Sequence, residues 1–261
     1  MLPFHLASHY LLYRLKSFKL HGVHSPFIFE LYHQVIRHDG DYYAYPLIEG
    51  LRQALLANNS TLLVTDFGAG PKAGLKKERK ISYIARTSAK PAKYAQLLFR
   101  LVGHFKPRVI FDLGTSLGVT TSYLALANRQ AEFYTFEGCP AIAGVAQENF
   151  RKLGLRHVNP VIGNLDETLS RQLDQVKQLD FVFFDGNHRY EPTMRYFETC
   201  LAKHHEHSVF VLDDLYWSAE MKRAWQEIKR HPQVCQTIDL FYVGLVFFRK
   251  SQPKENFTLL Y

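Results

Sequence analysis

One stretch decides the fold of this chain: VIFDLGTSLGVTT, residues 109–121. Its first three residues are apolar and predict a short buried parallel strand. Its last residues begin a predicted helix that runs to Ala127. Asp112, Gly114 and Gly118 lie between the two elements. A strand, a tight glycine turn and a helix N-terminus together predict a nucleotide-binding corner.

The spacing of the two glycines indicates which nucleotide is bound. Dinucleotide folds carry G-x-G-x-x-G, whose second glycine lets a pyrophosphate approach the backbone. Gly114 and Gly118 instead form G-x-x-x-G, with Asp112 two residues before the first glycine. This pattern suits a ligand without a phosphate and with a cationic amine, which Asp112 could hold directly or through water. A nicotinamide oxidoreductase would use a similar core, but its glycine fingerprint is absent.

The stretch resembles motif I of the class I S-adenosylmethionine-dependent methyltransferases. Further segments agree with that family in order and spacing: the second strand at 132–137, the helix from 140 to 153, the third strand with its loop at 158–166, the fourth strand with its polar end at 178–188, the fifth strand at 209–214 and the terminal hairpin at 240–248. The resemblance covers roughly residues 85–250. It implies an α/β Rossmann-like methyltransferase fold, with a mostly parallel seven-stranded sheet and an antiparallel C-terminal strand.

The resemblance also implies a binding site for S-adenosylmethionine. In the family, an acid at the end of the second strand binds the ribose hydroxyls, which here is Glu137. Asn164 and Leu165 are expected to border the adenine. The complete set of residues expected to bind the donor is Asp112, Gly114, Thr115, Ser116, Gly118, Glu137, Asn164, Leu165 and Asp185.

The end of the fourth predicted strand, Asp185-Gly-Asn-His188-Arg-Tyr-Glu, resembles a signature of small-molecule O-methyltransferases of the catechol and caffeoyl-CoA type. There the aspartate ligates Mg²⁺, and an Asp-Asn pair after the fifth strand supplies further ligands. The corresponding pair here is Asp213-Asp214, so the implied metal set is Asp185, Asp213 and Asp214. Asp214 stands in place of Asn, and His188 stands in place of a Lys base.

Catalysis is therefore assigned to His188 and Asp185. A histidine whose pKa lies near neutral can act as a general base without a metal, so Mg²⁺ dependence stays open. Asp213 or Asp214 could instead cap the helix that begins near Ser218.

The expected function is O-methylation of a hydroxyl on a small molecule. The alternative is a non-catalytic protein of the same fold that binds S-adenosylmethionine or a partner. The basic segment around residues 72–93 and the 14% aromatic content favour an anionic or aromatic acceptor. Nucleic acid is not the expected partner. The fourth strand lacks the Asn/Asp-Pro-Pro-aromatic tetrapeptide of base N-methyltransferases, which argues against base N-methylation and leaves ribose and other targets open.

Residues 1–84 form a predicted N-terminal helical extension with a basic loop, and residues 85–261 the methyltransferase domain. Helices are predicted over 2–18 and 27–36, with Ser25 capping the second and Pro26 at its first position. The extension could cover the substrate pocket or form a homodimer. His21 and His24 could bind a metal, although two such histidines in a turn are more often structural.

A second glycine segment, LLVTDFGAG at 62–70, superficially resembles the first. The residues that follow, 71–80, have no apolar helical face, so this region is interpreted as a strand or turn leading into a mobile basic loop. The basic residues of that loop could bind an anion, but the favoured interpretation is a solvated loop without a ligand.

The remaining sequence features concern the cellular compartment. Three widely spaced cysteines predict neither a disulfide framework nor a zinc site, which fits a reducing cytoplasm. No apolar run approaches the roughly 20 residues that span a bilayer. Charged residues and histidines interrupt the N-terminal apolar residues, so a signal peptide is not expected.

Overall fold

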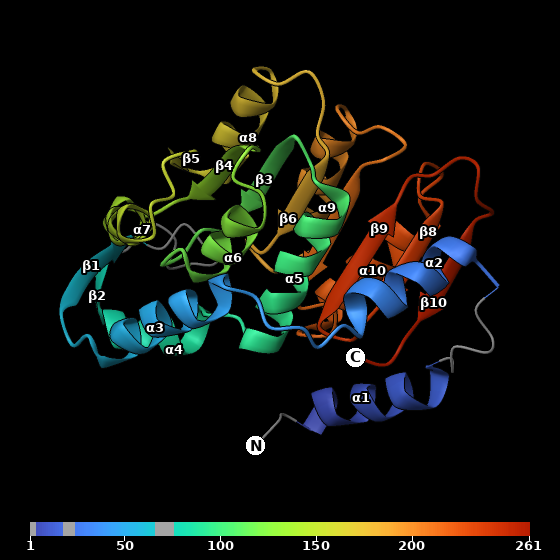
Figure 1. The fold of residues 1–261 in the computed structure, drawn as a ribbon, viewed down its shortest axis with the longest axis horizontal. Helices are drawn as coiled ribbons and strands as arrows, with labels where there is room; N and C mark the ends of the chain where they lie inside the picture. The colour runs from blue at the N-terminus through green and yellow to red at the C-terminus, as the bar shows by residue number, and fades with distance from the viewer. Residues whose placement is uncertain (1–3, 18–23, 66–75) are drawn as a thin grey trace. The chain divides into compact units, whose positions relative to one another are not determined.

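A computed structural model describes residues 4–17, 24–65 and 76–261 (Figure 1). The chain divides into two compact units. One unit is residues 39–177, and the other joins residues 1–38 to residues 178–261. The predicted boundary at residue 84 lies within the unit of residues 39–177, and the predicted domain division stays a prediction.

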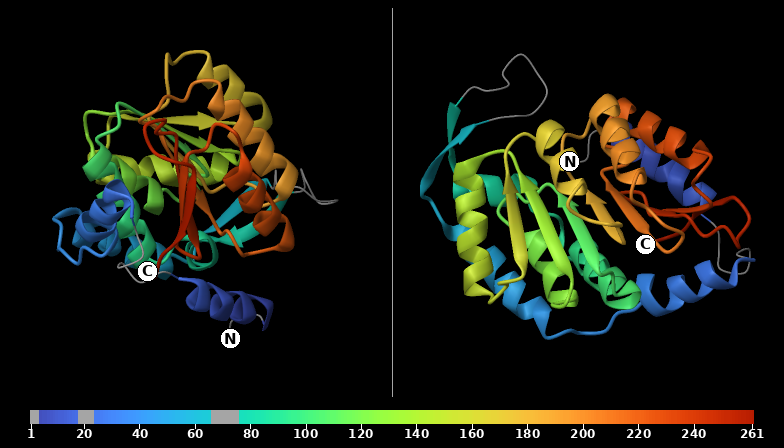
Figure 2. Two further views of the ribbon diagram at one scale, coloured as in Figure 1. Left: turned by 90° about the vertical axis from the view of Figure 1, so that its right-hand side faces the viewer. Right: turned by 90° about the horizontal axis from the view of Figure 1, so that it is seen from above.

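The unit of residues 39–177 holds the glycine corner. Its three parallel strands run side by side in the order β3-β4-β5 (Figure 2). In chain order the elements are α3 (Ala44–Ala57), β1 (Thr61–Thr65), β2 (Lys76–Lys80), α4 (Ile81–Ser88), α5 (Ala92–Phe105), β3 (Val109–Leu113), α6 (Val119–Ala127), β4 (Glu132–Glu137), α7 (Pro140–Lys152), β5 (Val158–Ile162) and α8 (Leu165–Leu173).

The other unit holds the chain ends. Its strands lie in the order β6-β7-β9-β8-β10, with β9 antiparallel to both of its neighbours. The elements are α1 (Phe4–Lys16), α2 (Pro26–Leu31), the π-helix η2 (Tyr32–Ile36), β6 (Phe181–Phe184), α9 (Tyr190–Leu201), β7 (Val209–Asp213), α10 (Ala219–Arg230), β8 (Gln236–Asp239), β9 (Val243–Phe247) and β10 (Glu255–Thr258).

The predicted fold class is confirmed: mostly parallel strands alternate with helices, and β9 is antiparallel to β7 and β8. Apart from the antiparallel pair β1-β2, the described residues form three strands in one unit and five in the other, one more than the predicted seven. The addition is β10, which pairs with β8 in parallel and buries Phe257 at 3% exposure. Its sequence, ENFT, carries a single large apolar residue, too weak a pattern to predict a strand.

The strands that lead to functional residues are buried over their whole length. All residues of β3, β6 and β7 are buried. Strands covered on both faces are apolar throughout rather than alternating, which explains why short apolar runs predicted these three strands. Their carboxyl ends therefore provide rigid positions for the polar residues that follow.

The N-terminal helices agree in part with the prediction. Ser25 accepts a hydrogen bond from the Ile28 amide at 3.4 Å, and Pro26 occupies the first helical turn, as predicted. The second helix is not uniform, because it continues from Tyr32 as a π-helix. Residue His21 lies outside the described residues.

The predicted basic loop is wrong for residues 76–80, which form β2. This strand pairs with β1 in antiparallel register, from Thr61 opposite Lys80 to Thr65 opposite Lys76. The pairing with β1 gives residues 76–80 the structure of a strand, which their local sequence pattern did not predict. Residues 66–75, including both glycines of the second glycine segment, lie outside the described residues.

No helix within the described ranges is long and apolar enough to cross a membrane. The three cysteines, Cys139, Cys200 and Cys235, are free thiols.

Candidate active site

The glycine corner is the loop from Gly114 to Gly118 between β3 and α6. Both glycines adopt a positive φ, of 135° and 79°, and Ser116 does so at 47°. The Thr115 amide donates to the carbonyl of Phe136 at 2.9 Å, which fastens the loop to β4. The loop is therefore a fixed turn that ends at the N-terminus of α6.

Gly118 has no room for a side chain. A Cβ at this position would lie 2.6 Å from Cε1 of Phe150 and 3.2 Å from Cβ of Ala146, both on α7. The positive φ would add strain for any L side chain. Gly118 thus lets α7 pack directly against the start of α6.

We expect Gly118→Ala to lower the free energy of unfolding by about 2–4 kcal/mol, since backbone strain and overpacking each cost about 1–3 kcal/mol. Gly144, on the same helix as Phe150, is the control, because a Cβ there meets nothing within 4 Å. Gly144→Ala should be neutral or stabilising by up to about 1 kcal/mol. Urea denaturation of both variants measures the difference, and equal stabilities would contradict this account.

Asp112 lies fully buried at the end of β3. Its Oδ2 accepts hydrogen bonds from the hydroxyls of Thr121 at 2.6 Å and Thr135 at 2.8 Å. Its Oδ1 is also buried and accepts no hydrogen bond from the described residues. Asp112 therefore ties β3 to α6 and β4, and one oxygen is left for a bound amine or a water.

Burial raises the pKa of Asp112 to about 7, against the opposing hydrogen bonds of Thr121 and Thr135. The ordinary value is 3.8, so between pH 4 and 7 the folded chain binds a proton that the unfolded chain has released. The contribution of Asp112 to stability therefore falls as the pH rises through this window.

We expect Asp112→Asn to remove this decrease in stability with rising pH. Relative to the unaltered chain, the variant should gain on the order of 2–4 kcal/mol in free energy of unfolding between pH 4 and 7, at about 1.4 kcal/mol per pKa unit. Denaturant titrations of both proteins across this range provide the measurement. A parallel pH dependence in the two proteins would show that Asp112 does not titrate there.

Glu137 ends β4 and is half-buried beside the glycine corner. Its Oε2 accepts from the Ser116 amide and its Oε1 from the Cys139 amide, each at 2.9 Å. Burial raises the pKa of Glu137, and the backbone amides oppose the rise. The structure thus brings Glu137 and Ser116 together, as expected of residues in one binding site.

Asn164 and Leu165 lie at the start of α8. Asn164 is the helix cap, with its Oδ1 accepting from the Asp166 amide at 3.1 Å. The preceding Gly163 donates its amide to the carbonyl of Glu137 at 3.0 Å, so this loop also lies at the end of β4. The predicted donor residues of this unit therefore lie on loops that follow adjacent parallel strands.

Several supporting residues were missed by the sequence analysis. Thr121 and Thr135 hold Asp112, and Asn149 donates to the carbonyl of Leu117 at 2.9 Å. Ser88, at the end of α4, forms a 2.7 Å hydrogen bond with the hydroxyl of Ser116. Thr121 lies within the stretch at 109–121 that predicted the nucleotide-binding corner. Its membership of that stretch was the one sequence signal that could have identified it as a partner of Asp112.

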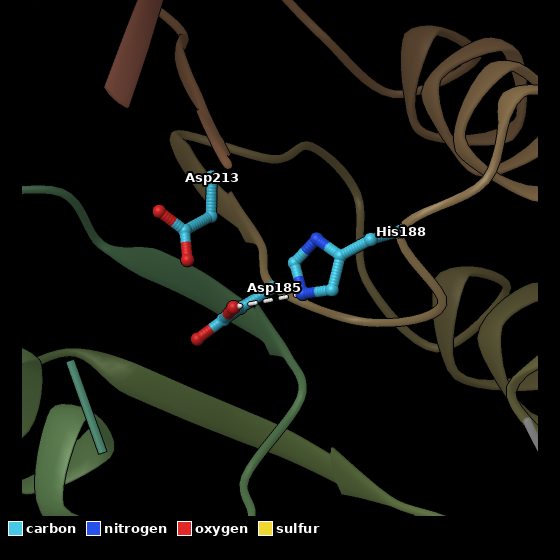
Figure 3. A group of neighbouring side chains, drawn as sticks. All are labelled: Asp185, His188 and Asp213. Atoms are coloured by element: carbon cyan, nitrogen blue, oxygen red, sulfur yellow. Dashed lines mark ion pairs between the residues drawn. The ribbon is translucent and has the colours of Figure 1, made fainter. Parts of the chain in front are cut away.

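The second group of predicted residues lies in the other unit. Asp185 follows β6 and Asp213 ends β7, and these strands are parallel neighbours. Together with His188 they form the acid cluster, whose ligand atoms all lie within 4.8 Å of one another (Figure 3). Nε2 of His188 lies 3.4 Å from Oδ1 of Asp185.

Asp214 is not a member of the acid cluster that the described residues form. Its φ of 53° turns the chain directly after β7. The acid cluster contains Asp185 and Asp213 of the predicted metal set, and the set itself stays a prediction. The cap of α10 is Ser218, whose hydroxyl oxygen accepts from the Met221 amide at 3.1 Å, so the alternative that Asp213 or Asp214 caps this helix is wrong.

The negative charge of the acid cluster raises the pKa of His188. Burial disfavours the imidazolium, but the hydrogen bond and charge of Asp185, with the charges of Asp213 and Asp214, outweigh it and raise the pKa to about 9. This pKa lies above the near-neutral range of an ordinary histidine. At neutral pH His188 is mainly protonated and must release its proton before it can act as a base.

The acid cluster fits a divalent cation. Asp213 is 3% exposed, and a buried carboxylate is costly unless a positive charge balances it. In the metal-free chain the imidazolium of His188 supplies that charge. Two carboxylates and an imidazole are also common metal ligands, and a cation would favour the neutral imidazole.

Comparison with known proteins agrees with the fold. Residues 111–215 match the family model of a methyltransferase domain. A methyltransferase from Podospora anserina bound to S-adenosylhomocysteine has a TM-score of 0.59 at 14% identity, covering 95% of this chain and 98% of that one. An O-methyltransferase from Bacillus cereus, in complex with S-adenosylhomocysteine, has a TM-score of 0.56 at 16% identity, covering 83% and 94%.

A third similar structure is the O-methyltransferase TomG from Streptomyces achromogenes, in complex with S-adenosylmethionine. Its TM-score is 0.57 at 17% identity, and the match covers 84% of this chain and 95% of that one. A search of curated proteins gives no match. Residues 111–215 are thus similar to a methyltransferase domain, and the chain has a Rossmann-like methyltransferase fold.

Proposed function

We propose that this protein transfers the methyl group of S-adenosylmethionine to a hydroxyl oxygen of a small molecule. The observation that carries the proposal is the glycine corner with Glu137 held beside it by the Ser116 amide at 2.9 Å, inside the matched methyltransferase domain. The solved structures with this fold that bind the donor or its product lend support.

The donor is held by residues of the unit 39–177. The Glu137 carboxylate is oriented by two backbone amides and has further lone pairs to accept from the two ribose hydroxyls. Gly114 and Gly118 let the backbone approach the donor closely. The free oxygen of Asp112 accepts from the donor amine, directly or through water. Asn164 and Leu165 border the adenine.

The acceptor hydroxyl is deprotonated by His188, which Asp185 orients. A divalent cation such as Mg²⁺ would be held by the carboxylates of Asp185 and Asp213, and would bind acceptor oxygens and lower the pKa of the hydroxyl. The methyl group then moves in line from sulfur to oxygen. Because the sulfonium is already activated, the protein contributes alignment and proton removal.

The acceptor is inferred to be aromatic or anionic. The 14% aromatic content supports an aromatic acceptor. The basic residues between positions 72 and 93 support an anionic one. We also propose that the protein is cytoplasmic, which its free cysteines support, and that it forms a homodimer.

Isothermal titration with S-adenosylmethionine and S-adenosylhomocysteine, with and without Mg²⁺, tests this function first. Micromolar binding of both ligands is expected, followed by turnover in a panel of catechols and other phenols, hydroxy acids and aliphatic alcohols. Titration with NAD(H) is the negative control. Absence of donor binding under every condition would overturn the proposal, and binding without any product would favour the non-catalytic alternative.

A further inference from the structure

We propose that the outward face of helix α1 binds the surface of an anionic lipid bilayer. This inference does not depend on the proposed enzymatic function. It rests on which side chains of α1 are buried against the protein and which are exposed to solvent.

One face of α1 is fixed to its own unit. Leu6 and Tyr13 are each 4% exposed and pack in a cluster with Phe241. The hydroxyl of Tyr13 donates to the carbonyl of Leu259, and the Tyr261 amide donates to that hydroxyl at 3.2 Å. The helix is therefore held by its inner face, and the direction of its outer face is determined.

The opposite face of α1 exposes three leucines. Leu11, Leu12 and Leu15 are 63%, 50% and 75% exposed. At about 100° per residue, these three side chains fall within an arc of about 100° opposite Leu6 and Tyr13. Single exposed leucines are ordinary, but three on one helix face form an apolar patch of the kind that marks an interaction surface.

Charge identifies the occupant of this surface. Helix α1 contains no acidic residue, and Arg14 and Lys16 are exposed in its last turn. On a helical wheel these two cations lie on either side of the leucine patch. An apolar stripe flanked by cations suits a helix that lies in the interface of an anionic bilayer. A second copy would bring like charges together, on a chain with a net charge of +8.

Co-sedimentation of the full chain with vesicles tests the proposal. We expect binding to phosphatidylcholine mixed with phosphatidylserine, much weaker binding to phosphatidylcholine alone, and release at high salt. The double variant Leu11→Ser/Leu15→Ser should lose about tenfold or more of the partition coefficient, because both leucines would be withdrawn from the bilayer. Arg14→Gln/Lys16→Gln should weaken binding only to the anionic vesicles.

The controls use equally exposed residues elsewhere. Leu47 on α3 and Leu63 on β1 are 52% and 51% exposed, so Leu47→Ser and Leu63→Ser should leave vesicle binding unchanged. Circular dichroism checks that each variant is folded, and donor titration keeps this outcome separate from that of the proposed function. Equal binding of the unaltered chain and Leu11→Ser/Leu15→Ser would overturn the proposal. So would a dimer in solution that this double variant dissociates without a change in vesicle binding.

Discussion

Asp185→Asn is expected to lower the rate of methyl transfer by about 10²–10⁴-fold, the range in which positioned acid–base groups contribute. The change removes a charged cation ligand and the partner that lies 3.4 Å from Nε2 of His188. The Asp185 side chain is 15% exposed, so the loss of its charge is easier to accommodate than a change at the more buried Asp213. Single-turnover kinetics with saturating donor measure the effect on the transfer step.

A second readout separates a catalytic role for Asp185 from a general loss of structure. Burial lowers the pKa of His188, and Asp185 contributes most to raising it. In the variant this pKa should therefore fall from about 9 toward or below its ordinary value of 6.5, as followed by NMR of the metal-free protein. Asp180→Asn is the matched control, since Asp180 pairs with His205 at 2.8 Å just before β6. Wild-type turnover in Asp185→Asn, or equal losses in both variants, would exclude the assigned role.

The second large effect is expected at the donor site. Glu137→Ala should raise the dissociation constant for S-adenosylmethionine by about 100-fold or more, because hydrogen bonds to a charged group contribute about 1.5–3 kcal/mol each and about 1.4 kcal/mol is a factor of ten. The variant leaves the amides of Ser116 and Cys139 without their acceptor and removes the group proposed to bind the ribose hydroxyls.

Glu132 provides the control for this prediction. It begins the same strand β4 and is exposed, so Glu132→Ala should leave the dissociation constant unchanged. Glu137→Gln keeps one carbonyl oxygen and should fall between the two. Calorimetric titration at a temperature where all variants are folded gives the three constants. An unaltered constant in Glu137→Ala would remove Glu137 from the donor site.

The local patterns of the sequence were sufficient for the framework of the fold. Apolar runs of three or four residues identified the buried strands, and the G-x-x-x-G spacing after Asp112 identified the corner. Ser25 followed by Pro26 identified the start of a helix. Each of these signals is local, since strand burial, turn conformation and helix capping depend on a few consecutive residues.

The tertiary structure alone decided the protonation and the partners of the site residues. Asp112 accepts a hydrogen bond from Thr135, which lies 23 positions away, and Asp213 and Asp214, beyond the next helix, add to the effect of Asp185 on the pKa of His188. The strand β2 exists through its pairing with β1, and the outward leucines of α1 are defined by its contact with Phe241. Electrostatic fields and burial are sums over neighbours in space, which no local pattern of residues contains.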